Sequence, residues 1–464
     1  MIELSAAQVA EAVGGEVVGD SALVVTGSVE TDSRLVSEGS IFVAKPGEVT
    51  DGHLFVAQAQ ASGAVVAIVE HLVDSSITQI VVPDAVLALG KLAQFVLEQV
   101  RDSVKVIGIT GSNGKTTTKN MLRAILEQVG PTVAPIESYN NEVGAPISVL
   151  RVDRNTRFLV AELGADGIGS IAYLAKLIRP DVAVELKVGL AHVGEFGGIE
   201  VTAKIKAELL ENTASNAVAV LNRDDAYIRE MSHKAVGQIL WFGTGPDCNY
   251  RAENLQLSLD GTSFDLVWPD GSVDKIRLQI IGEHHVMNAL ASAAVADSLQ
   301  VDRPLIVSAL QSLPLAERWR MQLTNRADGV SVINDAYNAS PDSTKAALQT
   351  LAQLGRSTGR RTIAVLGEMA ELGEFSRTEH DAIGRLAVRL NLNQVIAVGE
   401  NAKLIHMGAT QEGSYDGESL YFDAIEPAFD AISGMLRSGD IVLVKSSKSA
   451  NLRHLGDRLA EVQP

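Results

Sequence analysis

The first hundred residues alternate apolar and polar positions in the short blocks typical of strands and helices. Three apolar runs predict strands: SIFVAKPG (40–47), AVVAIV (64–69) and ITQIVVPD (77–84). LFVAQAQASG (54–63) predicts a helix closed by Gly63, and ALGKLAQFVLEQV (88–100) predicts a second helix. The polar RDS that follows interrupts the pattern, so we place a first domain at residues 1–102.

From residue 104 onward the pattern is an apolar strand, a glycine-rich turn and a helix, repeated. The strands are predicted at VKVIGIT (104–110), RFLVAELG (157–164) and PDVAVELKVG (180–189). This alternation is typical of a mostly parallel sheet. Glu185 and Lys187 share one face of the third strand, so we expect that strand to lie near an edge of the sheet or half in water.

A helix at 284–300 precedes a proline-marked stretch, and we place the second boundary near Leu313–Leu315. The central domain is therefore predicted at 103–313 and a third at 314–464. The third domain has four apolar runs that predict strands: GVSVINDAY, RRTIAVLGEM, NQVIAVGE and GDIVLVKS. The predicted class is α/β in three domains, which suits 464 residues at roughly 150 residues per domain.

Composition narrows the possible partners. The formal net charge of −18 argues against binding to nucleic acid or to an anionic membrane, so an anionic ligand must be held by local groups. Cys248 is the single cysteine and has no metal-ligand spacing around it. The first residues carry no signal-peptide pattern, and no apolar run approaches the roughly 18 residues of a membrane span. We expect a cytoplasmic protein without membrane insertion.

GITGSNGKTT (108–117) lies between a predicted strand and a predicted helix, which is the setting of a phosphate-binding loop. The spacing GxxxxGK[ST] is not met, because Ile109 stands five residues before Gly114. The narrower pattern TGSNGKTT remains. Backbone N–H groups from Gly111 to Thr117 would face phosphate oxygens, Lys115 would reach the terminal phosphates of ATP, and the Thr116 hydroxyl would bind Mg²⁺. The loop residues in question are Gly111, Ser112, Asn113, Gly114, Lys115, Thr116 and Thr117.

Two further side chains are expected beside this loop. Glu162 ends the apolar run RFLVAE just before glycines, where a nucleotide-bound metal often finds a carboxylate. His192 follows the next predicted strand, at the carboxyl end where parallel sheets bind ligands. A solvated glutamate and a structural histidine are the alternatives.

TGSNGKTTT, AELG, AHVGEFG, KAE and GEHHVMNALASA occur in this order, and together they resemble the ATP-dependent Mur ligases of peptidoglycan synthesis. The resemblance spans essentially the whole chain. It implies a central domain of the phosphate-loop type, a smaller N-terminal α/β domain and a C-terminal Rossmann-like domain. It also implies two Mg²⁺ ions held by Thr116, Glu162, His192 and Lys206.

In that family the lysine of K-x-E is carbamylated by CO2, and the match falls on Lys206. An uncharged amine adds CO2, and a metal-rich site favours the anionic product. Two departures from the family pattern stand out. Lys187 occupies a position where asparagine is usual, and KSSKSANL (445–452) stands where KGSR is usual.

The first domain resembles the family's UDP-sugar-binding module through TDSR, F-x-A-x-x-G and DGH. The resemblance assigns Ser33, Arg34, Asp51 and His53 to substrate binding. ESYNNEVGAP adds Asn140 and Asn141, side-chain amides suited to a UDP-muramoyl group.

INDAYNASPDS (333–343) and LGEMAELGEFSRTEH (366–380) resemble the branch of the family that adds D-alanyl-D-alanine to UDP-N-acetylmuramoyl-tripeptide through an acyl phosphate. The DNPR motif of the branch that adds the third amino acid is absent from the sequence. The resemblance places Asn288, Asp335 and Tyr337 at the nucleotide, with Asn338 beside them. Arg318 is the expected arginine near the phosphates, with Arg320 as the alternative.

Three alternatives remain: a Mur ligase that adds a single amino acid, a folylpolyglutamate synthetase, and a nucleotide-binding regulator without activity. Residues 1–102 argue against the synthetase, which lacks a UDP-binding domain. The set Lys115, Glu162, His192 and Lys206 argues against the regulator. The third residue of the tripeptide, lysine or diaminopimelate, stays open, and we expect a monomer.

Overall fold

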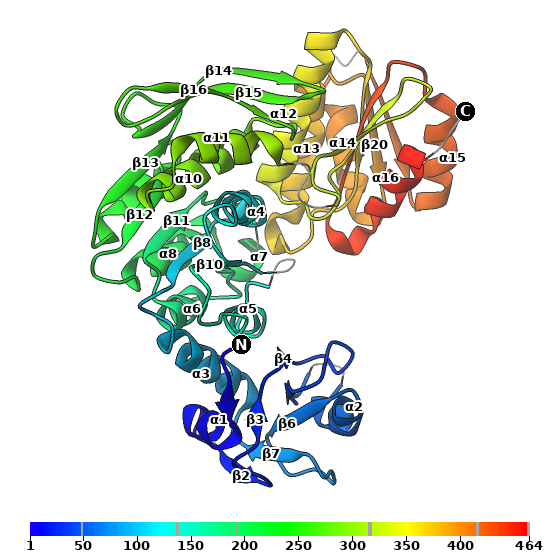
Figure 1. The fold of residues 1–464 in the computed structure, drawn as a ribbon. Coiled ribbons are helices and arrows are strands. Elements are labelled where there is room, and N and C mark those ends of the chain that lie inside the picture. Colours follow the sequence, from blue (N-terminus) through cyan, green and yellow to red (C-terminus); the bar gives the residue numbers. More distant parts are fainter. Residues whose placement is uncertain (48–49, 136–138, 192, 314–317, 414–416, 462–464) are drawn as a thin grey trace.

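The structure, a computed structural model, describes residues 1–464 except 48–49, 136–138, 192, 314–317, 414–416 and 462–464. The predicted boundary at Leu313–Leu315 therefore lies partly, and His192 wholly, outside the described residues. Three large sheets, each packed with helices, follow one another along the chain, and a two-stranded sheet lies in the first unit (Figure 1). In the described part of the chain, no helix is long and apolar enough to cross a membrane.

The N-terminal unit is built on a five-stranded sheet in the order β2-β7-β6-β5-β4, with β2 antiparallel and the others parallel. A separate pair, β1 and β3, is antiparallel. The strands are β1 Leu4–Ser5, β2 Glu16–Val18, β3 Val24–Val25, β4 Val29–Glu30, β5 Ser40–Val43, β6 Ala64–Val69 and β7 Thr78–Val81. The helices are α1 Ala6–Val13, α2 Val56–Ala61 and α3 Ala85–Glu98. The three predicted strands and two predicted helices are confirmed.

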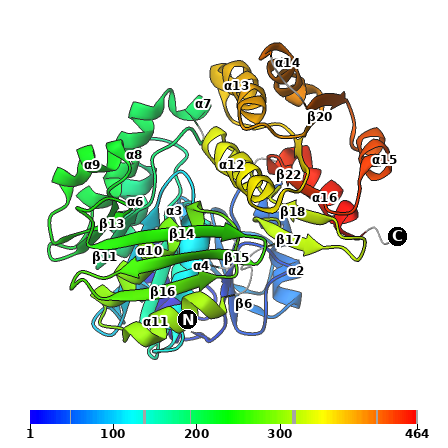
Figure 2. The ribbon, with the colours of Figure 1, turned by 90° about the horizontal axis from the view of Figure 1, so that it is seen from above.

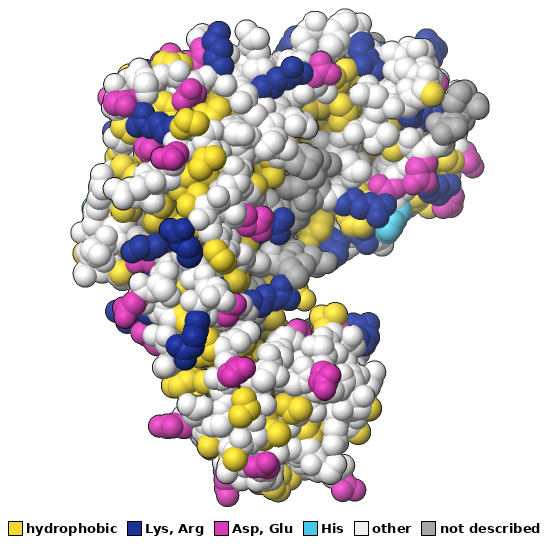
Figure 3. All heavy atoms as spheres, in the orientation of Figure 1, with side chains coloured by type: hydrophobic (Ala, Val, Ile, Leu, Met, Phe, Trp, Pro, Cys, Tyr) yellow, Lys and Arg dark blue, Asp and Glu magenta, His cyan; other side chains and the backbone are white. Residues whose placement is uncertain are grey.

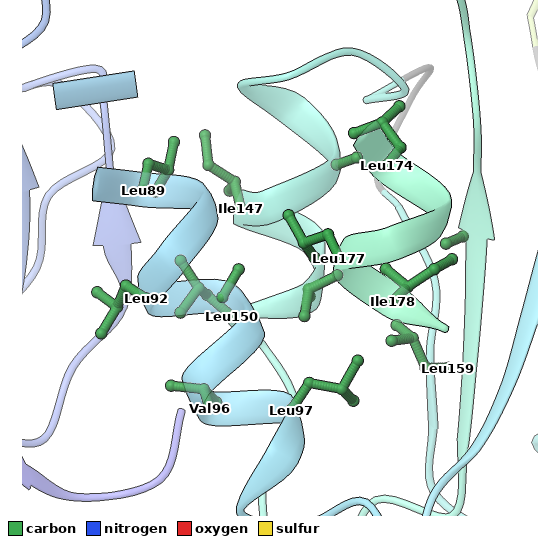
Figure 4. Close-up of a cluster of buried hydrophobic side chains, with 14 of the residues drawn as sticks. Leu89, Leu92, Val96, Leu97, Ile147, Leu150, Leu159, Leu174, Leu177 and Ile178 are labelled. Carbon is green, nitrogen blue, oxygen red and sulfur yellow. The ribbon is translucent and has the colours of Figure 1, made fainter. Parts of the chain in front are cut away.

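The last of these helices, α3, belongs to two cores at once. Its apolar side chains pack against α1, and Leu89 and Leu97 also join the cluster formed by α5 and α6 of the next unit (Figure 4). A boundary at residue 102 therefore stays a prediction, because the core runs continuously through α3.

The central unit has a nine-stranded sheet in the order β16-β15-β14-β13-β12-β11-β8-β10-β9. Its strands run parallel from β9 to β14, and β15 and β16 complete an antiparallel extension. The strands are β8 Lys105–Thr110, β9 Thr132–Val133, β10 Phe158–Glu162, β11 Val182–Glu185, β12 Val218–Asn222, β13 Ile239–Gly243, β14 Tyr250–Ser258, β15 Gly261–Val267 and β16 Val273–Leu278. The predicted mostly parallel sheet is confirmed.

Two layers of helices cover this sheet. α4 and α10 pack on one face together with α11, and α5, α6 and α8 pack on the other. The helices are α4 Lys115–Leu126, α5 Gly144–Val149, α6 Ser170–Ile178, α7 Val193–Phe196, α8 Ile199–Glu211, α9 Ala226–Met231, α10 His284–Ser298 and α11 Arg303–Ser312. Since the strands are buried on both sides, they read as apolar runs rather than as alternating patterns.

The C-terminal unit has a six-stranded sheet in the order β17-β18-β22-β19-β20-β21, parallel except for β17. The four predicted strands are present, and β17 and β21 add two that their half-buried, partly polar sequences did not indicate. The strands are β17 Gln322–Asn325, β18 Ser331–Asn334, β19 Thr362–Leu366, β20 Gln394–Val398, β21 Glu418–Phe422 and β22 Ile441–Lys445. The helices are α12 Pro341–Thr358, α13 Ser376–Arg389, α14 Lys403–Gln411, α15 Ile425–Met435 and α16 Leu452–Glu461.

Helix α12 of this unit lies next to the central unit (Figure 2). The carboxylate of Asp342, at its start, accepts from the backbone N–H of Leu190 at 2.8 Å. In the space-filling view a hollow opens between the N-terminal unit and the other two (Figure 3).

Candidate active site

The glycine-rich loop joins the end of β8 to the start of α4, as the sequence predicts. Gly111 and Gly114 have φ values of 149° and 91°, which side-chain-bearing residues rarely adopt. A Cβ on Gly114 would lie 2.5 Å from Oδ1 of Asn288 and would displace that side chain. The Lys115 ammonium donates to the Gly111 carbonyl at 2.6 Å. The lysine therefore lies folded back over its own loop.

A cavity of about 370 Å³ opens at this loop, between the central and C-terminal units. Most of the predicted nucleotide site lines it: Ser112, Asn113, Gly114, Lys115, Thr116, Thr117, Asn288, Asp335 and Tyr337. Asn140, Lys206 and Asn338 line it as well. Gly111, Glu162, Arg318, Asn141 and the four predicted residues of the N-terminal unit are not among its lining residues.

Glu162 lies under the loop at the end of β10 and is fully buried. The Thr116 hydroxyl donates to its carboxylate at 3.3 Å, and the Lys119 ammonium lies 3.6 Å from the other carboxylate oxygen. Lys119 is itself almost fully buried and also donates to the Pro135 carbonyl at 2.9 Å. Sequence reasoning missed this lysine, because a lysine one turn into a helix normally reads as a solvated residue.

Thr116 and Glu162 supply oxygen donors of the kind that Mg²⁺ prefers, and Mg²⁺ usually needs one or two carboxylates besides phosphates and water. Among the described residues, no group of three or more His, Cys, Asp or Glu side chains is arranged to hold a metal ion. The donors present therefore fit a metal that is shared with a nucleotide rather than one held by the protein alone.

Lys206 projects from α8 into the cavity wall and is 4% exposed. Burial lowers the pKa of its ammonium to about 7, and the positive charge of Lys115 acts in the same direction. Burial therefore favours the uncharged amine of Lys206. Lys204, on the same helix, is exposed.

Glu185 corrects the prediction of an edge or half-wet strand. β11 lies between β8 and β12 inside the sheet, ends at Glu185, and buries that side chain completely. Burial raises the pKa of the Glu185 carboxyl, and the positive charge of Lys206 acts against this rise. Neither carboxylate oxygen has a hydrogen-bond partner within the described part of the chain. The acidic residue in the strand therefore marks the interior beside Lys206, not a solvent edge.

The register of the sheet separates the two buried glutamates. Glu162 pairs with Ile109 and Glu185 pairs with Thr110, which are neighbours on β8 and point to opposite faces. Glu162 thus faces α4 and the phosphate loop, whereas Glu185 faces α8. Lys187 lies beyond the end of β11, lines the cavity, and has its ammonium 3.7 Å from Oδ1 of Asp342.

Of the two arginines considered for the phosphates, Arg320 lines the cavity and Arg318 does not. Arg318 donates to Asp457 at 2.7 Å and stacks on Trp319, away from the cavity. Arg320 lines the cavity, lies 4.2 Å over the Tyr337 ring, and has Nη2 3.4 Å from the Thr116 hydroxyl. Trp319, between them, has φ 63°, so the two arginines do not share a direction as they would on a regular strand.

The C-terminal unit contributes the segment from Asp335 to Asn338 to the cavity wall, and Lys445 holds this segment in place. Lys445 donates to Oδ2 of Asp335 at 2.6 Å and to the Asn338 carbonyl at 3.0 Å. Lys445 begins the KSSKSANL stretch that departs from the family pattern. This stretch therefore still fixes the segment that lines the cavity.

Two histidines of α10 were quoted in a motif but not predicted as site residues. His284 and His285 line the cavity, and burial lowers both pKa values, that of His284 to about 4. Nδ1 of His284 and Nε2 of His285 have no hydrogen-bond partner within the described residues. Together with the similarly unpaired amide nitrogen of Asn113, they offer buried polar atoms to a ligand.

The two asparagines predicted for the substrate lie in different settings. Asn140 lines the cavity, and its backbone carbonyl accepts from the Gly164 N–H at 2.7 Å. The side chain of Asn141 accepts from the Gly144 N–H at 2.9 Å, at the first residue of α5. Asn141 is therefore engaged in the fold.

The residues predicted in the N-terminal unit lie outside the cavity and have partners of their own. Ser33 donates to Gln58 at 3.3 Å, and the largely exposed Arg34 is paired with Asp32. Nδ1 of His53 lies 2.6 Å from the Asp51 carboxylate, and Nε2 accepts from the Glu70 N–H at 2.8 Å. This buried histidine therefore joins the segment 51–53 to the backbone at Glu70.

Known proteins match the chain along almost all its length. Family models match three segments: the Mur ligase family, catalytic domain, at 26–95, the Mur ligase middle domain at 109–296, and the Mur ligase, glutamate ligase domain, at 319–448. UDP-N-acetylmuramoyl-tripeptide–D-alanyl-D-alanine ligase of Mycobacterium leprae is 40% identical, over 99% of this chain and 98% of the relative.

Solved structures of Mur ligases are similar to this chain over nearly its full length. A crystal structure of MurF from Acinetobacter baumannii is 34% identical, covers 99% of both chains and has a TM-score of 0.89. MurF ligase from Thermotoga maritima, solved in complex with ADP, is 28% identical, with a TM-score of 0.81, over 94% of this chain and 98% of that one. With this coverage, the resemblance found in the sequence is confirmed, and the chain belongs to the Mur ligase family and is an ATP-dependent ligase.

Proposed function

We propose that this chain joins D-alanyl-D-alanine to UDP-N-acetylmuramoyl-tripeptide, with ATP as the source of energy. Near-full-length similarity to relatives named for this reaction carries the proposal. The cavity supports it, because it gathers the phosphate loop, Lys206 and the segment 335–338 from two units of the chain.

The chemistry follows from the need to activate a carboxylate before an amine can attack it. The carboxylate of the tripeptide takes the γ-phosphoryl group of ATP, and ADP leaves. The amine of D-alanyl-D-alanine then attacks the acyl phosphate, loses a proton and forms the amide as inorganic phosphate departs. Lys115 and Arg320 stabilise the negative charge that gathers on the transferred group. The loop N–H groups and the start of α4 hold the remaining phosphates.

Thr116 and Glu162 are proposed to hold Mg²⁺, together with His192, which lies outside the described residues. Bound Mg²⁺ would supply charge neutralisation at the phosphates. Lys206 is proposed to be carbamylated and to bind a second Mg²⁺. Its burial and lowered pKa support this role, since an uncharged amine is the form that adds CO2.

The three units divide the substrates. We assign UDP-muramoyl binding to residues 1–102, through Ser33, Arg34, Asp51 and His53 with Asn140 and Asn141 nearby. ATP binding is assigned to 103–313, with Asn288, and to Asp335 and Tyr337 of the third unit. D-alanyl-D-alanine is assigned to 314–464, with Asn338 beside it. We place the reaction in the cytoplasm, by a monomer that binds no nucleic acid.

The test is turnover with defined substrates. The purified chain is mixed with ATP, Mg²⁺, D-alanyl-D-alanine and the UDP-tripeptide, in separate lysine and diaminopimelate forms. Phosphate release that needs both peptides, with a product of the expected mass, supports the proposal. Release with a single amino acid in place of the dipeptide would identify another Mur ligase activity, and release with a folate and glutamate would identify a folylpolyglutamate synthetase. No release in any mixture would overturn the proposal.

A further inference from the structure

The loop from Leu163 to Gly169, which connects β10 to α6, forms one wall of the cavity. Gly164, Ala165 and Asp166 line the cavity directly. At its beginning, the loop is held by the neighbouring strand, because the Leu163 N–H donates to the Ile109 carbonyl at 2.8 Å. What holds its other end is less obvious from the sequence.

Helix α6 begins without a capping side chain of its own. Its N-cap residue is Gly169, with φ 91°, and no side chain of the N-cap residue satisfies the free N–H groups of the first turn. Such N–H groups need acceptors when they are removed from water. Here the acceptor comes from another helix: the Glu208 carboxylate accepts from the Gly169 N–H at 2.7 Å and from the Ala172 N–H at 2.9 Å.

Glu208 is 8% exposed, so both contacts are shielded from water. A carboxylate bound to backbone N–H groups at a helix N-terminus gains from the charge of the acceptor and from the helix dipole. The two hydrogen bonds of Glu208 therefore hold the start of α6 more strongly than a solvated glutamate would. The loop is thus held by β8 at its beginning and by Glu208 of α8 at its end.

The same helix carries Lys206 two residues earlier, and Lys206 lines the same cavity as the loop. α8 thus positions two parts of the cavity wall. It carries the amine of Lys206 itself, and through Glu208 it holds the loop that contains Gly164–Asp166. We propose that Glu208 is a positioning residue, which fixes the loop 163–169 against Lys206 and so places the carboxylate substrate for phosphoryl transfer.

This inference rests on the proposed function, because it assigns the wall at 164–166 to the UDP-muramoyl peptide rather than to ATP. Asn140, also predicted to bind that substrate, contacts the same wall through its bond to Gly164. The phosphate loop is fastened separately, by Ser112 to Lys187 and Gly189. Loss of the Glu208 contacts should therefore affect one substrate and spare the other.

The experiment compares Glu208→Ala, which loses both acceptors, with Glu208→Gln, which keeps the length of the side chain but loses the charge and one acceptor oxygen. Glu211→Gln is the matched control, since Glu211 lies on the same helix, is half exposed, and pairs with Lys234. We expect kcat/KM for the UDP-tripeptide to fall at least about tenfold in Glu208→Ala and less in Glu208→Gln, since small misplacements of a reacting group are costly. The KM for ATP should stay within about twofold, as should all constants of Glu211→Gln.

Hydrogen exchange provides a readout that does not need turnover. In Glu208→Gln, amides of the segment 163–175 should exchange faster than in the wild type, with exchange elsewhere unchanged. Equal losses for both substrates, or unchanged kinetics in Glu208→Ala, would overturn the positioning role. An inactive wild type would overturn the proposed function. Even then, faster exchange confined to 163–175 would support the attachment of the loop, and unchanged exchange there would overturn it.

Discussion

The central cavity and the N-terminal unit both contain predicted site residues, but their polar atoms are used differently. In the cavity, Asn113, His284 and His285 each keep a buried polar atom that has no partner within the described residues. In the N-terminal unit, both ring nitrogens of His53 are paired with its own fold. Unpaired buried groups are costly and therefore indicate a place for a ligand, whereas satisfied groups first hold the protein together.

The difference predicts two kinds of mutational effect. Substitutions in the cavity should reduce turnover and leave the fold intact. Substitutions in the N-terminal unit should act on stability or on the affinity for one substrate. The following experiments test this contrast, beginning with the largest expected effect.

Lys115→Ala should cause the largest loss of activity. Its ammonium is the loop's own cation beside the phosphates, and removal of one preorganised electrostatic group typically lowers kcat by about 100- to 1,000-fold. The melting temperature should change little, because the hydrogen bond of the lysine stays within its loop. Steady-state phosphate release and thermal unfolding measure both. Lys105→Ala, at an exposed position on β8, is the control. Activity within tenfold of the wild type would remove Lys115 from the mechanism.

Lys206→Ala should also lower kcat by about 100-fold or more, because a charge-stabilising group is lost. Short-chain carboxylates added to the assay should restore part of it, by replacing the carbamate. The exposed Lys204→Ala is the matched control and should be unaffected. An active Lys206→Ala enzyme would exclude a role for the carbamate.

The pH dependence of carbamylation tests the same lysine without turnover. Burial lowers the pKa of Lys206 to about 7, so the ammonium dominates below this pH and the reactive amine above it. In metal-free protein the carbamate signal from ¹³C-labelled bicarbonate should therefore increase between pH 6 and 8. It should be absent in Lys206→Ala, and a signal of equal size in that variant would place the carbamate elsewhere.

The two arginines give the sharpest comparison within the C-terminal unit. Arg320→Ala removes a guanidinium from the cavity and should lower kcat/KM for ATP at least about tenfold, as expected for an arginine at a transferred phosphate. Arg318→Ala removes a contact to Asp457 outside the cavity and should change the same constant by less than about threefold. A larger loss of kcat/KM in Arg318→Ala than in Arg320→Ala would show that the segment 318–320 changes conformation when ATP binds.

These residues also show which features of the fold and the site could be predicted from the sequence. The strands and the phosphate loop were predictable, because apolar runs buried on both faces and a glycine turn are local signals. Lys119 and Glu185 were not, since a charged residue reads the same in a sequence whether it faces water or another buried charge. The choice between Arg318 and Arg320 depends on the left-handed conformation of Trp319, which no pattern indicates.

His53→Ala should act on stability. The ring is buried and joins Asp51 to the backbone at Glu70, so its loss leaves buried polar groups without partners and should lower the free energy of unfolding by about 1–3 kcal/mol. Chemical unfolding measures this change. Binding of ATP to the folded variant should be unchanged in calorimetry. A stable variant that still fails to bind the UDP-tripeptide would instead make His53 a direct ligand of the substrate.

Arg34→Gln should have the smallest effect and tests whether any predicted residue of the N-terminal unit serves the ligand alone. Its side chain is largely exposed and paired with Asp32, and exposed ion pairs contribute little to stability. The melting temperature should therefore stay unchanged, while the KM for the UDP-tripeptide rises by about two- to fivefold. The increase should shrink at high salt, because an exposed charge is screened by ions. If instead the variant melts earlier at an unchanged KM, Arg34 belongs with His53 among the residues that hold the fold.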